Sequence, residues 1–307
     1  MKIPFTLIFA GLVGFAVLTG CHSTRFSFGV MSDVHLQGGN LQQRQILDSV
    51  IFLVNNAGKI IREGTGLSVR KPSGLFVTGD LTDSGTQEAW KEFEEIFGLN
   101  GEGRLEMPVY ETFGNHDGGV NGTVREGIRT RNTMRKGVVM TSGNGLHYAI
   151  ERCGHLFIVL GSYPGDRWDP ECEWCHYFNE SFREAEGSLG FLEDALKTNR
   201  EGRNLPVFLF FHYGWDDFSM LWWTQAEQER FFGALKDSRI SGIFHGHNHQ
   251  IDAYSGQGYD VFISGSPQRG EKAGETLFVS VTRGEIRVFV LSGSGVQELT
   301  LNDPGDN

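Results

Sequence analysis

The sequence has no excess of positive charge. Its 27 lysine and arginine residues are outnumbered by 38 aspartate and glutamate residues, so the formal net charge is -11. A protein that binds duplex nucleic acid normally presents a broad basic surface to the phosphate backbone. The composition therefore disfavours duplex nucleic acid as a partner, although bound cations can reverse the charge of a single cleft.

Internal repeats and long low-complexity linkers are also absent, so nothing divides the 307 residues into separate domains. Hydrophobic residues make up 39% of the chain, which is enough for one large core. The 42 glycines are dispersed through turn-like contexts such as 38–39 and 118–119. We expect one domain over residues 26–298, followed by a polar carboxyl-terminal tail over residues 299–307.

Cysteine is scarce, with only four residues in the chain. In an exported protein, Cys172 and Cys175 can close a small disulfide that does not involve Cys153. His176 completes a CxxCH string, the pattern of c-type haem attachment, so a haem-binding module is an alternative interpretation of the function. The surrounding sequence offers no obvious axial partner, which disfavours haem.

A long apolar run lies at the amino terminus, over residues 3–17, and is followed by Leu18-Thr19-Gly20-Cys21. This arrangement resembles a bacterial lipoprotein signal with its lipobox. Residues 1–20 would then be a signal peptide and residues 21–25 a short tether. The exported domain would be anchored to the membrane by lipid on Cys21, facing the periplasm or the cell exterior. The alternatives are an uncleaved anchor helix, or secretion with Cys21 as an ordinary thiol.

Five short polar signatures occur in order along the chain. They are Asp33-Val34-His35, Gly79-Asp80-Leu81-Thr82-Asp83, Gly114-Asn115-His116-Asp117, His212, and Gly246-His247-Asn248-His249. Each one alone is as well explained by a turn or a cap. Their carboxylate, amide and imidazole groups suit manganese, iron or zinc, and no thiolate is among them. Together, the five signatures predict a two-metal site.

Each signature follows an apolar segment of buried-strand length. These segments are residues 26–31, 74–78, 108–113, 205–211 and 240–244. Helical spacing occurs after the first two of them, at Leu47, Val50, Ile51 and Val54, and at Ala89, Trp90, Phe93 and Phe97. Alternating strands and helices predict βαβ units, whose ligands bind beyond the carboxyl ends of the strands. The strand-like segments 259–263, 277–282 and 285–291 have no helices between them and predict a second, mostly antiparallel sheet.

These motifs, from about Phe26 to Val290, resemble those of the calcineurin-like metallophosphoesterase superfamily. The resemblance implies an α/β fold, the α/β/β/α sandwich, in which helices flank two facing mixed β-sheets. It also implies hydrolysis of phosphate esters, either diesters or monoesters, by a hydroxide that two divalent or trivalent metal ions activate. Two cations about 3.5 to 4 Å apart can hold both the attacking and the leaving oxygen, and lower the pKa of bound water towards about 7.

The resemblance further assigns a role to each residue of the signatures. The first metal would be bound by Asp33, His35 and His249, and the second by Asn115, His212 and His247. Asp80 would bridge both metals. His116 would face the scissile phosphate and protonate the leaving oxygen, and Asp83 would orient His116. Three further histidines have no place in this pattern, and we predict that they are structural: His147, His155 and His245.

Some positions distinguish branches of the superfamily. Ser84 and Asp117 stand where its protein phosphatases carry arginine and glutamate, and Asp83 stands where its purple acid phosphatases carry tyrosine. These differences favour the phosphodiesterase or general phosphatase branches, acting on a small or exposed phosphate ester. Some members of the fold are non-catalytic protein-binding scaffolds, but those usually lose ligands or the catalytic histidine, and this chain retains all of them.

Aromatic residues are concentrated in two stretches. One is the insertion-like segment 163–182, and the other follows His212 and contains Tyr213, Trp215, Trp222 and Trp223. Such residues either form an apolar wall for the leaving group of a substrate or pack beneath a loop. If they form the wall, replacing Trp215 by alanine should shift the preference among substrates.

Overall fold

The computed structural model describes residues 25–119, 121–166, 185–215 and 223–301. The predicted signal peptide, Cys21, the Cys172, Cys175 and His176 cluster, and Trp222 lie outside these residues. Within the described ranges, none of the helices combines the length and the apolar character needed to cross a bilayer.

Two mixed β-sheets form the centre of the molecule. The first has the strand order β13-β12-β11-β1-β2-β3 and consists of β13 (Gly295–Leu299), β12 (Glu285–Ser292), β11 (Thr276–Thr282), β1 (Arg25–Met31), β2 (Leu75–Val77) and β3 (Val109–Glu111). The second has the order β4-β5-β6-β7-β8-β10-β9 and consists of β4 (Val138–Thr141), β5 (Tyr148–Arg152), β6 (His155–Val159), β7 (Val207–Phe210), β8 (Ile240–His245), β10 (Tyr259–Ile263) and β9 (Asp252–Gly256).

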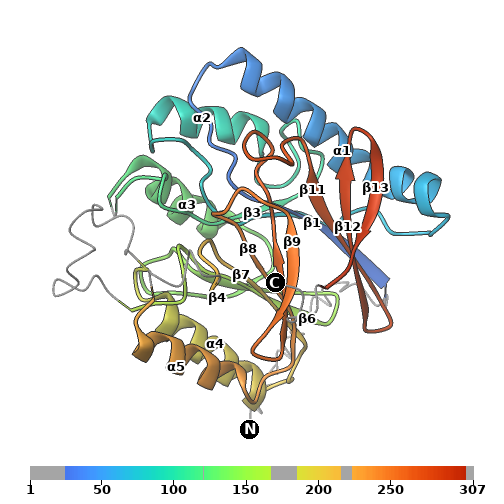
Figure 1. Cartoon of the computed structure of the whole chain (residues 1–307). Coiled ribbons are helices and arrows are strands. Elements are labelled where there is room, and N and C mark those ends of the chain that lie inside the picture. Colours follow the sequence, from blue (N-terminus) through green and yellow to red (C-terminus); the bar gives the residue numbers. More distant parts are fainter. Residues whose placement is uncertain (1–24, 120, 167–184, 216–222, 302–307) are drawn as a thin grey trace, which may run out of the picture.

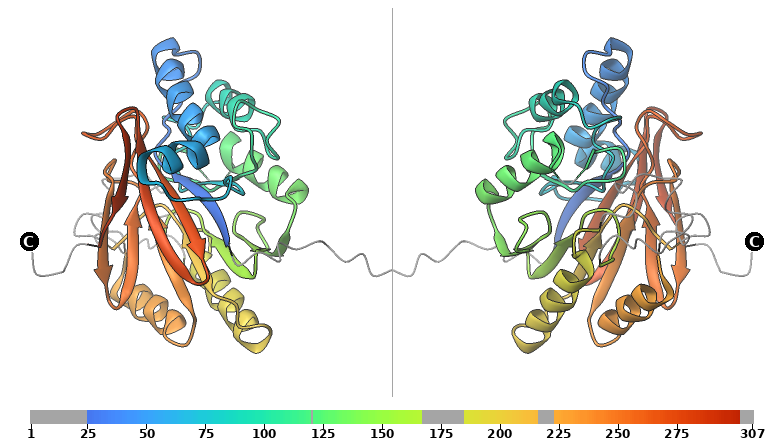
Figure 2. Two further views of the ribbon diagram at one scale, coloured as in Figure 1. Left: turned by 90° about the vertical axis from the view of Figure 1, so that its right-hand side faces the viewer. Right: turned by 90° about the vertical axis from the view of Figure 1, so that its left-hand side faces the viewer.

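The two sheets pack face to face through phenylalanine side chains. Phe76 of the first sheet stacks on Phe210 of the second, with ring centroids 4.0 Å apart. Phe28 of β1 contacts the rings of Phe208 and Phe244 edge to face, at 5.2 and 5.9 Å. Full burial of one such side chain stabilises a fold by about 1.5 to 3 kcal/mol. The aromatic layer therefore holds the two sheets together. Figure 2 shows the strands between two sets of helices, α1 to α3 at the top and α4 and α5 at the bottom.

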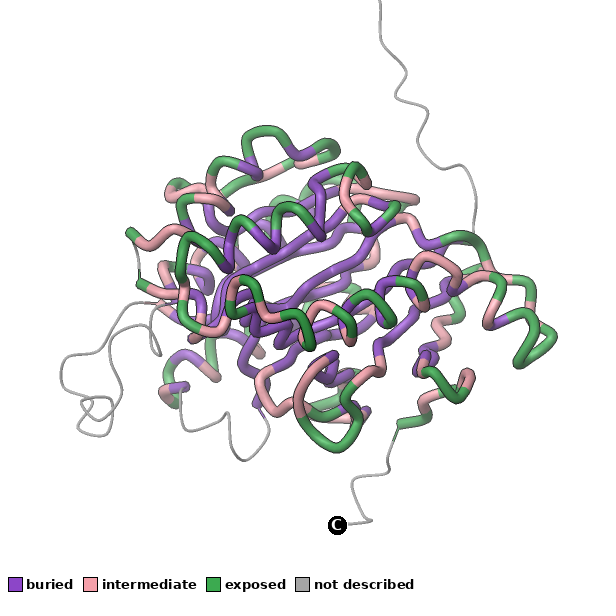
Figure 3. Tube along the Cα trace, turned by 90° about the horizontal axis from the view of Figure 1, so that it is seen from above, coloured by how far each residue is buried: buried purple, intermediate pink, exposed green. Residues whose placement is uncertain are grey.

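Helices cover the outer face of each sheet (Figure 1). The first sheet is covered by α1 (Leu41–Thr65), α2 (Gln87–Ile96) and α3 (Thr123–Met134), and the second by α4 (Ser188–Glu201) and α5 (Gln225–Leu235). The apolar residues predicted from helical spacing in α1 and α2 are buried, and the opposite faces of the helices are exposed (Figure 3). The predicted α/β/β/α sandwich is confirmed.

The predicted membership of the second sheet was wrong. β11 pairs antiparallel with β1, with Val279 opposite Phe28, so β11 and β12 extend the first sheet. β10 pairs parallel with β8, with Val261 opposite Ile243, and so lies between β8 and β9 in the second sheet. Because a strand has the same side-chain alternation whatever its neighbour, its local sequence cannot show which strand it pairs with.

The parallel strands of both sheets end at one shared edge. β1, β2 and β3 run parallel in the first sheet, as do β7, β8 and β10 in the second. Thr78, directly after β2, accepts a hydrogen bond at its backbone oxygen from His212, which follows β7. The loops after these six strands therefore meet in space, where ligands of such sheets normally bind.

Candidate metal centre

Most of the predicted ligands lie on loops with an uncommon backbone conformation. Five of them have a positive φ between 49° and 76°: Asp33, His35, Asp80, His247 and His249. For residues other than glycine, this left-handed region is sparsely populated and persists only where the surroundings impose it. The loops are therefore held in shapes that direct these side chains into one cluster.

The first predicted group of ligands is assembled. Asp33, His35 and His249 each offer a ligand atom within 4.8 Å of the others. The Nε2 atoms of His35 and His249 are 2.9 Å apart, and His249 Nε2 is 3.4 Å from Asp33 Oδ1. Asp33 and His35 are fully buried.

The second predicted group is assembled beside the first. Asp80, His212 and His247 offer ligand atoms within 4.8 Å of one another. His212 Nε2 lies 3.4 Å from Asp80 Oδ2 and 3.2 Å from the side-chain oxygen of Asn115. Asn115 thus lies beside this group.

Asp80 lies between the two groups. Its Oδ2 atom is 3.4 Å from His212 Nε2 and 3.7 Å from His35 Nε2, so one oxygen contacts a ligand of each group. Its other oxygen accepts a hydrogen bond from the backbone N–H of His116 at 2.9 Å. This is the position that a bridging carboxylate requires.

The donor atoms fit bound cations. His212 Nδ1 contacts the backbone oxygen of Thr78 at 2.8 Å, and His35 Nδ1 lies 3.4 Å from Asp83 Oδ1, so both rings turn Nε2 inward. Such outer contacts are typical of metal-binding histidines. Asp33 Oδ1 is buried, and none of the described residues donates a hydrogen bond to it within the usual geometric limits. Oxygen and imidazole donors of this kind suit manganese, iron or zinc.

The charges of the cluster stabilise one another. Burial alone would raise the pKa of the Asp80 carboxyl group, but the charge of His212, its hydrogen bond and the charge of His35 together lower it to about 2. Burial likewise opposes a charge on His212, but Asp80, Asp33 and the hydrogen bond to the backbone of Thr78 together raise the pKa of the ring to about 9. A cation has to displace the proton that His212 holds, because histidine binds metal in its neutral form.

His116 and Asp83 are in contact, but through the main chain of Asp83. His116 Nδ1 lies 2.8 Å from the backbone oxygen of Asp83. The Asp83 carboxylate instead lies 3.4 Å from His35 Nδ1 and pairs with Arg269. A ring nitrogen of His116 also lies within 4.8 Å of ligand atoms of His35 and Asp80, so His116 borders the cluster.

The sequence matches a known family. The model of the calcineurin-like phosphoesterases matches residues 26–251. The chain belongs to the calcineurin-like phosphoesterase family. This match covers every signature that the sequence analysis identified. No curated protein matches the sequence significantly.

Solved structures of this fold are similar over most of the chain. A dimetal phosphatase from Danio rerio has a TM-score of 0.56 at 14% identity, over 90% of this chain and 99% of its own. A purple acid phosphatase from yellow lupin has a TM-score of 0.55 at 11% identity, over 92% of this chain and 54% of its own, so this chain spans about half its length. GAP50, the anchor in the inner membrane complex of Plasmodium, has a TM-score of 0.52 at 13% identity, over 91% and 89%. At such identities, the likeness shows the fold alone.

In this calcineurin-like phosphoesterase, Asp117 ties the ligand loops together. Its buried carboxylate accepts hydrogen bonds from the backbone N–H groups of Gly114, Leu81 and Thr82, at 2.9 to 3.1 Å, and from the Thr82 hydroxyl. Burial, and then the nearby charge of Asp80, raise its pKa to about 6. This role of Asp117 was not predicted from the sequence, although the residue stands at the end of the third signature.

Residues 264–270, after β10, form a support that the sequence analysis missed. Ser266 Oγ donates to the backbone oxygen of Asp33 at 2.6 Å, and Ser264 Oγ donates to that of His245 at 2.9 Å. Gly270, with φ +81°, approaches His249 so closely that a Cβ would lie 2.1 Å from its backbone oxygen. Arg269 of this 264–270 loop pairs with Asp83. The only sequence signal for this support is that the 264–270 loop directly follows a predicted strand.

The aromatic residues after His212 pack beneath the site. Tyr213 lies with its ring centroid 4.5 Å from that of His247 and 5.0 Å from that of His212. Trp215 and Trp223, which are 9% and 5% exposed, belong to the core between the second sheet and α5 and contact Phe231. Of the two predicted alternatives, packing is therefore the one found for these tryptophans.

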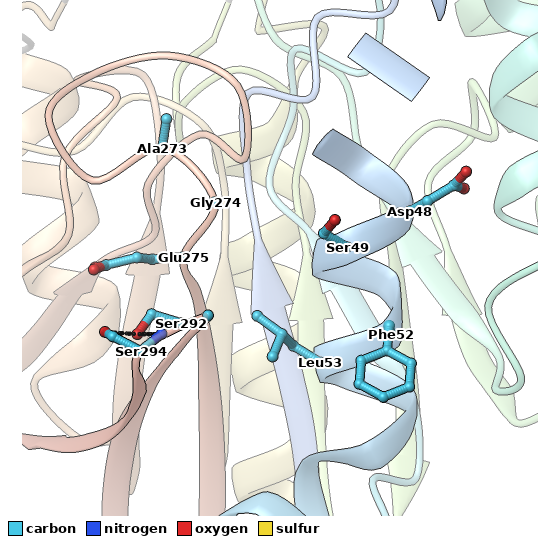
Figure 4. A pocket seen from close by; sticks show the side chains of 10 residues that line it. Asp48, Ser49, Phe52, Leu53, Ala273, Gly274, Glu275, Ser292 and Ser294 are labelled. Atoms are coloured by element: carbon cyan, nitrogen blue, oxygen red, sulfur yellow. Dashed lines mark hydrogen bonds between the residues drawn. The ribbon is translucent and has the colours of Figure 1, made fainter. Parts of the chain in front are cut away.

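The three histidines predicted to be structural lie outside the metal-binding groups found in the described part of the chain. His147 and His245 are fully buried, and His155 packs against the rings of Phe26 and Phe208. A pocket of about 760 Å³ between α1 and the turns near β11 and β12 also contains none of the predicted ligands (Figure 4). Its lining includes Phe52 and Glu275.

Proposed function

We propose that this protein hydrolyses phosphate esters with the help of two metal ions. The observation that carries this proposal is the position of Asp80, whose Oδ2 atom contacts one ligand histidine of each group. One cation would be held by Asp33, His35 and His249, the other by Asn115, His212 and His247, and Asp80 would bind both. When bound, such a pair of cations acts as a Lewis acid towards the phosphate and lowers the pKa of coordinated water.

His116 is the proton donor to the leaving oxygen in this proposal. The backbone oxygen of Asp83 is a fixed acceptor for Nδ1–H at 2.8 Å, so Nε2 is the nitrogen that can exchange a proton with the substrate. Because Nδ1–H keeps the same acceptor in both charge states, the ring need not turn when Nε2 gains or loses its proton. A positioned acid of this kind contributes about 10²- to 10⁴-fold to a rate.

Hydrolysis of para-nitrophenyl phosphate and of its bis ester, with metal content measured on the same samples, tests this proposal. We expect Asp80→Asn to lose bound metal and activity together, because the amide cannot carry the bridging charge. His116→Ala should retain both metals but lose about 10²-fold or more of kcat. An Asp80→Asn variant as active as the native protein would contradict the bridging role, and loss of both metals from His116→Ala would make His116 a ligand.

We also propose that the enzyme is exported and tethered by lipid on Cys21. Support comes from the apolar run over residues 3–17 and the Leu18-Thr19-Gly20-Cys21 string that follows it. Membrane fractions of a bacterial host should contain the native chain labelled by radioactive palmitate. The Cys21→Ala variant should carry no label, and equal labelling of both chains would refute the tether.

A further inference from the structure

Arg269 contacts Asp83, and Asp83 in turn contacts two residues of the proposed active site, His35 and His116. Its guanidinium group pairs with the carboxylate of Asp83. That carboxylate lies 3.4 Å from Nδ1 of His35, and the backbone oxygen of the same residue lies 2.8 Å from Nδ1 of His116. The guanidinium group is therefore placed at the side of the cluster where His35 and His116 meet, with ring centroids 4.7 Å apart.

The backbone that carries Arg269 is fixed relative to the metal ligands. The N–H groups of Gln268 and Arg269 donate to Ser266 Oγ at 3.1 and 3.0 Å, and this hydroxyl donates to the backbone oxygen of Asp33. Gly270 lies against the backbone of His249. The 264–270 loop is thus anchored on two ligands of the first group, which gives the Arg269 side chain a defined starting point beside the cluster.

Arg269 retains hydrogen-bonding capacity. A guanidinium group has five N–H donors, and among the described residues only its Nη2 atom has a side-chain partner, Asp83. The side chain is 34% exposed, so the remaining donors are open to solvent beside the cluster. Arg131 and Arg135 differ, because both are buried and bind Glu111 and backbone oxygens.

We propose that Arg269 binds a non-bridging oxygen of the substrate phosphate and thereby makes the protein selective for phosphomonoesters. This proposal rests on the proposed phosphoesterase function. A monoester dianion has three non-bridging oxygens and one more negative charge than a diester, in which a second ester group replaces one of these oxygens. A guanidinium group can bind non-bridging oxygens of either ester, and its attraction to the monoester is stronger because of the extra negative charge. Arg269 therefore binds the monoester more strongly than the diester.

The test compares Arg269→Gln and Arg269→Lys with Arg287→Gln. Arg287 is a matched control, because it is also 34% exposed and pairs with a carboxylate, that of Glu298, at the edge of the first sheet. For each variant, kcat and KM are measured with para-nitrophenyl phosphate and its bis ester. Calorimetry measures the affinity of the metal-loaded protein for inorganic phosphate, and elemental analysis measures its metal content.

We expect Arg269→Gln to lower kcat/KM for the monoester about 10- to 100-fold, and for the diester by less than about 3-fold. Its affinity for inorganic phosphate should fall about tenfold, with metal content unchanged. Arg269→Lys keeps the charge but lacks the planar guanidinium group, so its kcat/KM for the monoester should lie between those of the native protein and Arg269→Gln. Arg287→Gln should match the native protein.

Equal losses for both esters with unchanged phosphate affinity would overturn the proposal, because Arg269 would then act only by positioning Asp83. Loss of metal from Arg269→Gln and Arg269→Lys would overturn it as well. If the native protein hydrolyses neither ester, the proposed function fails. The phosphate titration still decides on Arg269 in that case, because an unchanged affinity in Arg269→Gln would refute the contact.

Discussion

At the scale of single residues, the four positions of the third signature have separate tasks. Gly114 leaves space, because a Cβ there would lie 2.2 Å from Asp80 Oδ1 and 2.7 Å from His212 Nε2. Asn115 adds its oxygen to the second group, and His116 borders the cluster. Asp117 fixes the two loops through four hydrogen bonds. Substitutions at these four positions should therefore disturb the site in different ways.

The clustering of the seven candidate ligands could be predicted from the sequence, because residue type and order along the chain mark them, and all seven lie in the two groups. The contacts of Asp83 could not be predicted from the sequence. Spacing shows that Asp83 is near His116, but not that its backbone oxygen makes the contact while its carboxylate turns to His35. Arg269 lies 186 positions from Asp83, and no local pattern marks a pair so far apart in the chain.

At the scale of elements, the positions of helices and strands along the sequence could be predicted, but the pairing of the strands could not. The predicted segment 259–263 coincides with β10, and the apolar spacing of α1 matched the face that it buries. These patterns arise within one element, from the periods of strand and helix. Pairing of β11 with β1 depends on residues about 250 positions apart, which is why the predicted sheet for β11 was wrong.

A buried ion pair joins β3 to α3 at the site. Glu111 of β3 is fully buried and accepts from Arg131 Nε at 2.8 Å and from Arg135 Nη2 at 2.6 Å. Burial alone would raise the pKa of Glu111, but the two guanidinium groups lower it. β3 leads into Asn115 and His116, so this pair positions the loop that carries both.

We expect Glu111→Gln to lower the free energy of unfolding by about 3 kcal/mol, because two buried guanidinium groups lose their counter-charge. Urea denaturation at neutral pH measures this loss. The matched control is Glu298→Gln, which removes a surface pair with Arg287 and should cost less than about 1 kcal/mol. Similar losses of unfolding free energy in the two variants would mean that the buried interaction of Glu111 stabilises the fold no more than a surface ion pair does.

At the scale of the whole molecule, neither sheet contains a complete site. The first sheet supplies Asp33, His35, Asp80 and Asn115, and the second supplies His212, His247 and His249. Each of the two groups takes ligands from both sheets, so neither group is complete unless the phenylalanine layer holds the sheets together. The site therefore depends on the packed core.

The stability of the whole fold also depends on pH, through a histidine outside the site. His147 is fully buried between β4 and β5, where Nδ1 accepts from the backbone N–H of Gly161 at 3.0 Å and Nε2 lies 3.2 Å from the backbone oxygen of Glu186. Burial, with a smaller contribution from Arg125, lowers its pKa from 6.5 to about 4. Between pH 6.5 and about 4, His147 therefore binds a proton in the unfolded chain but stays neutral in the folded chain.

The folded state accordingly loses stability as the pH falls from 6.5 to about 4, by about 3 kcal/mol in all. His147→Asn keeps an acceptor for Gly161 and removes the titration. Urea denaturation of both proteins at pH 7.5 and 4.5 measures the effect, and their difference in unfolding free energy should change by about 2 to 3 kcal/mol in favour of the variant at the lower pH. Asp117 titrates in this range with the opposite sign, but it is present in both proteins and cancels. A difference that is the same at both pH values would show that the pKa of His147 is not lowered in the folded state.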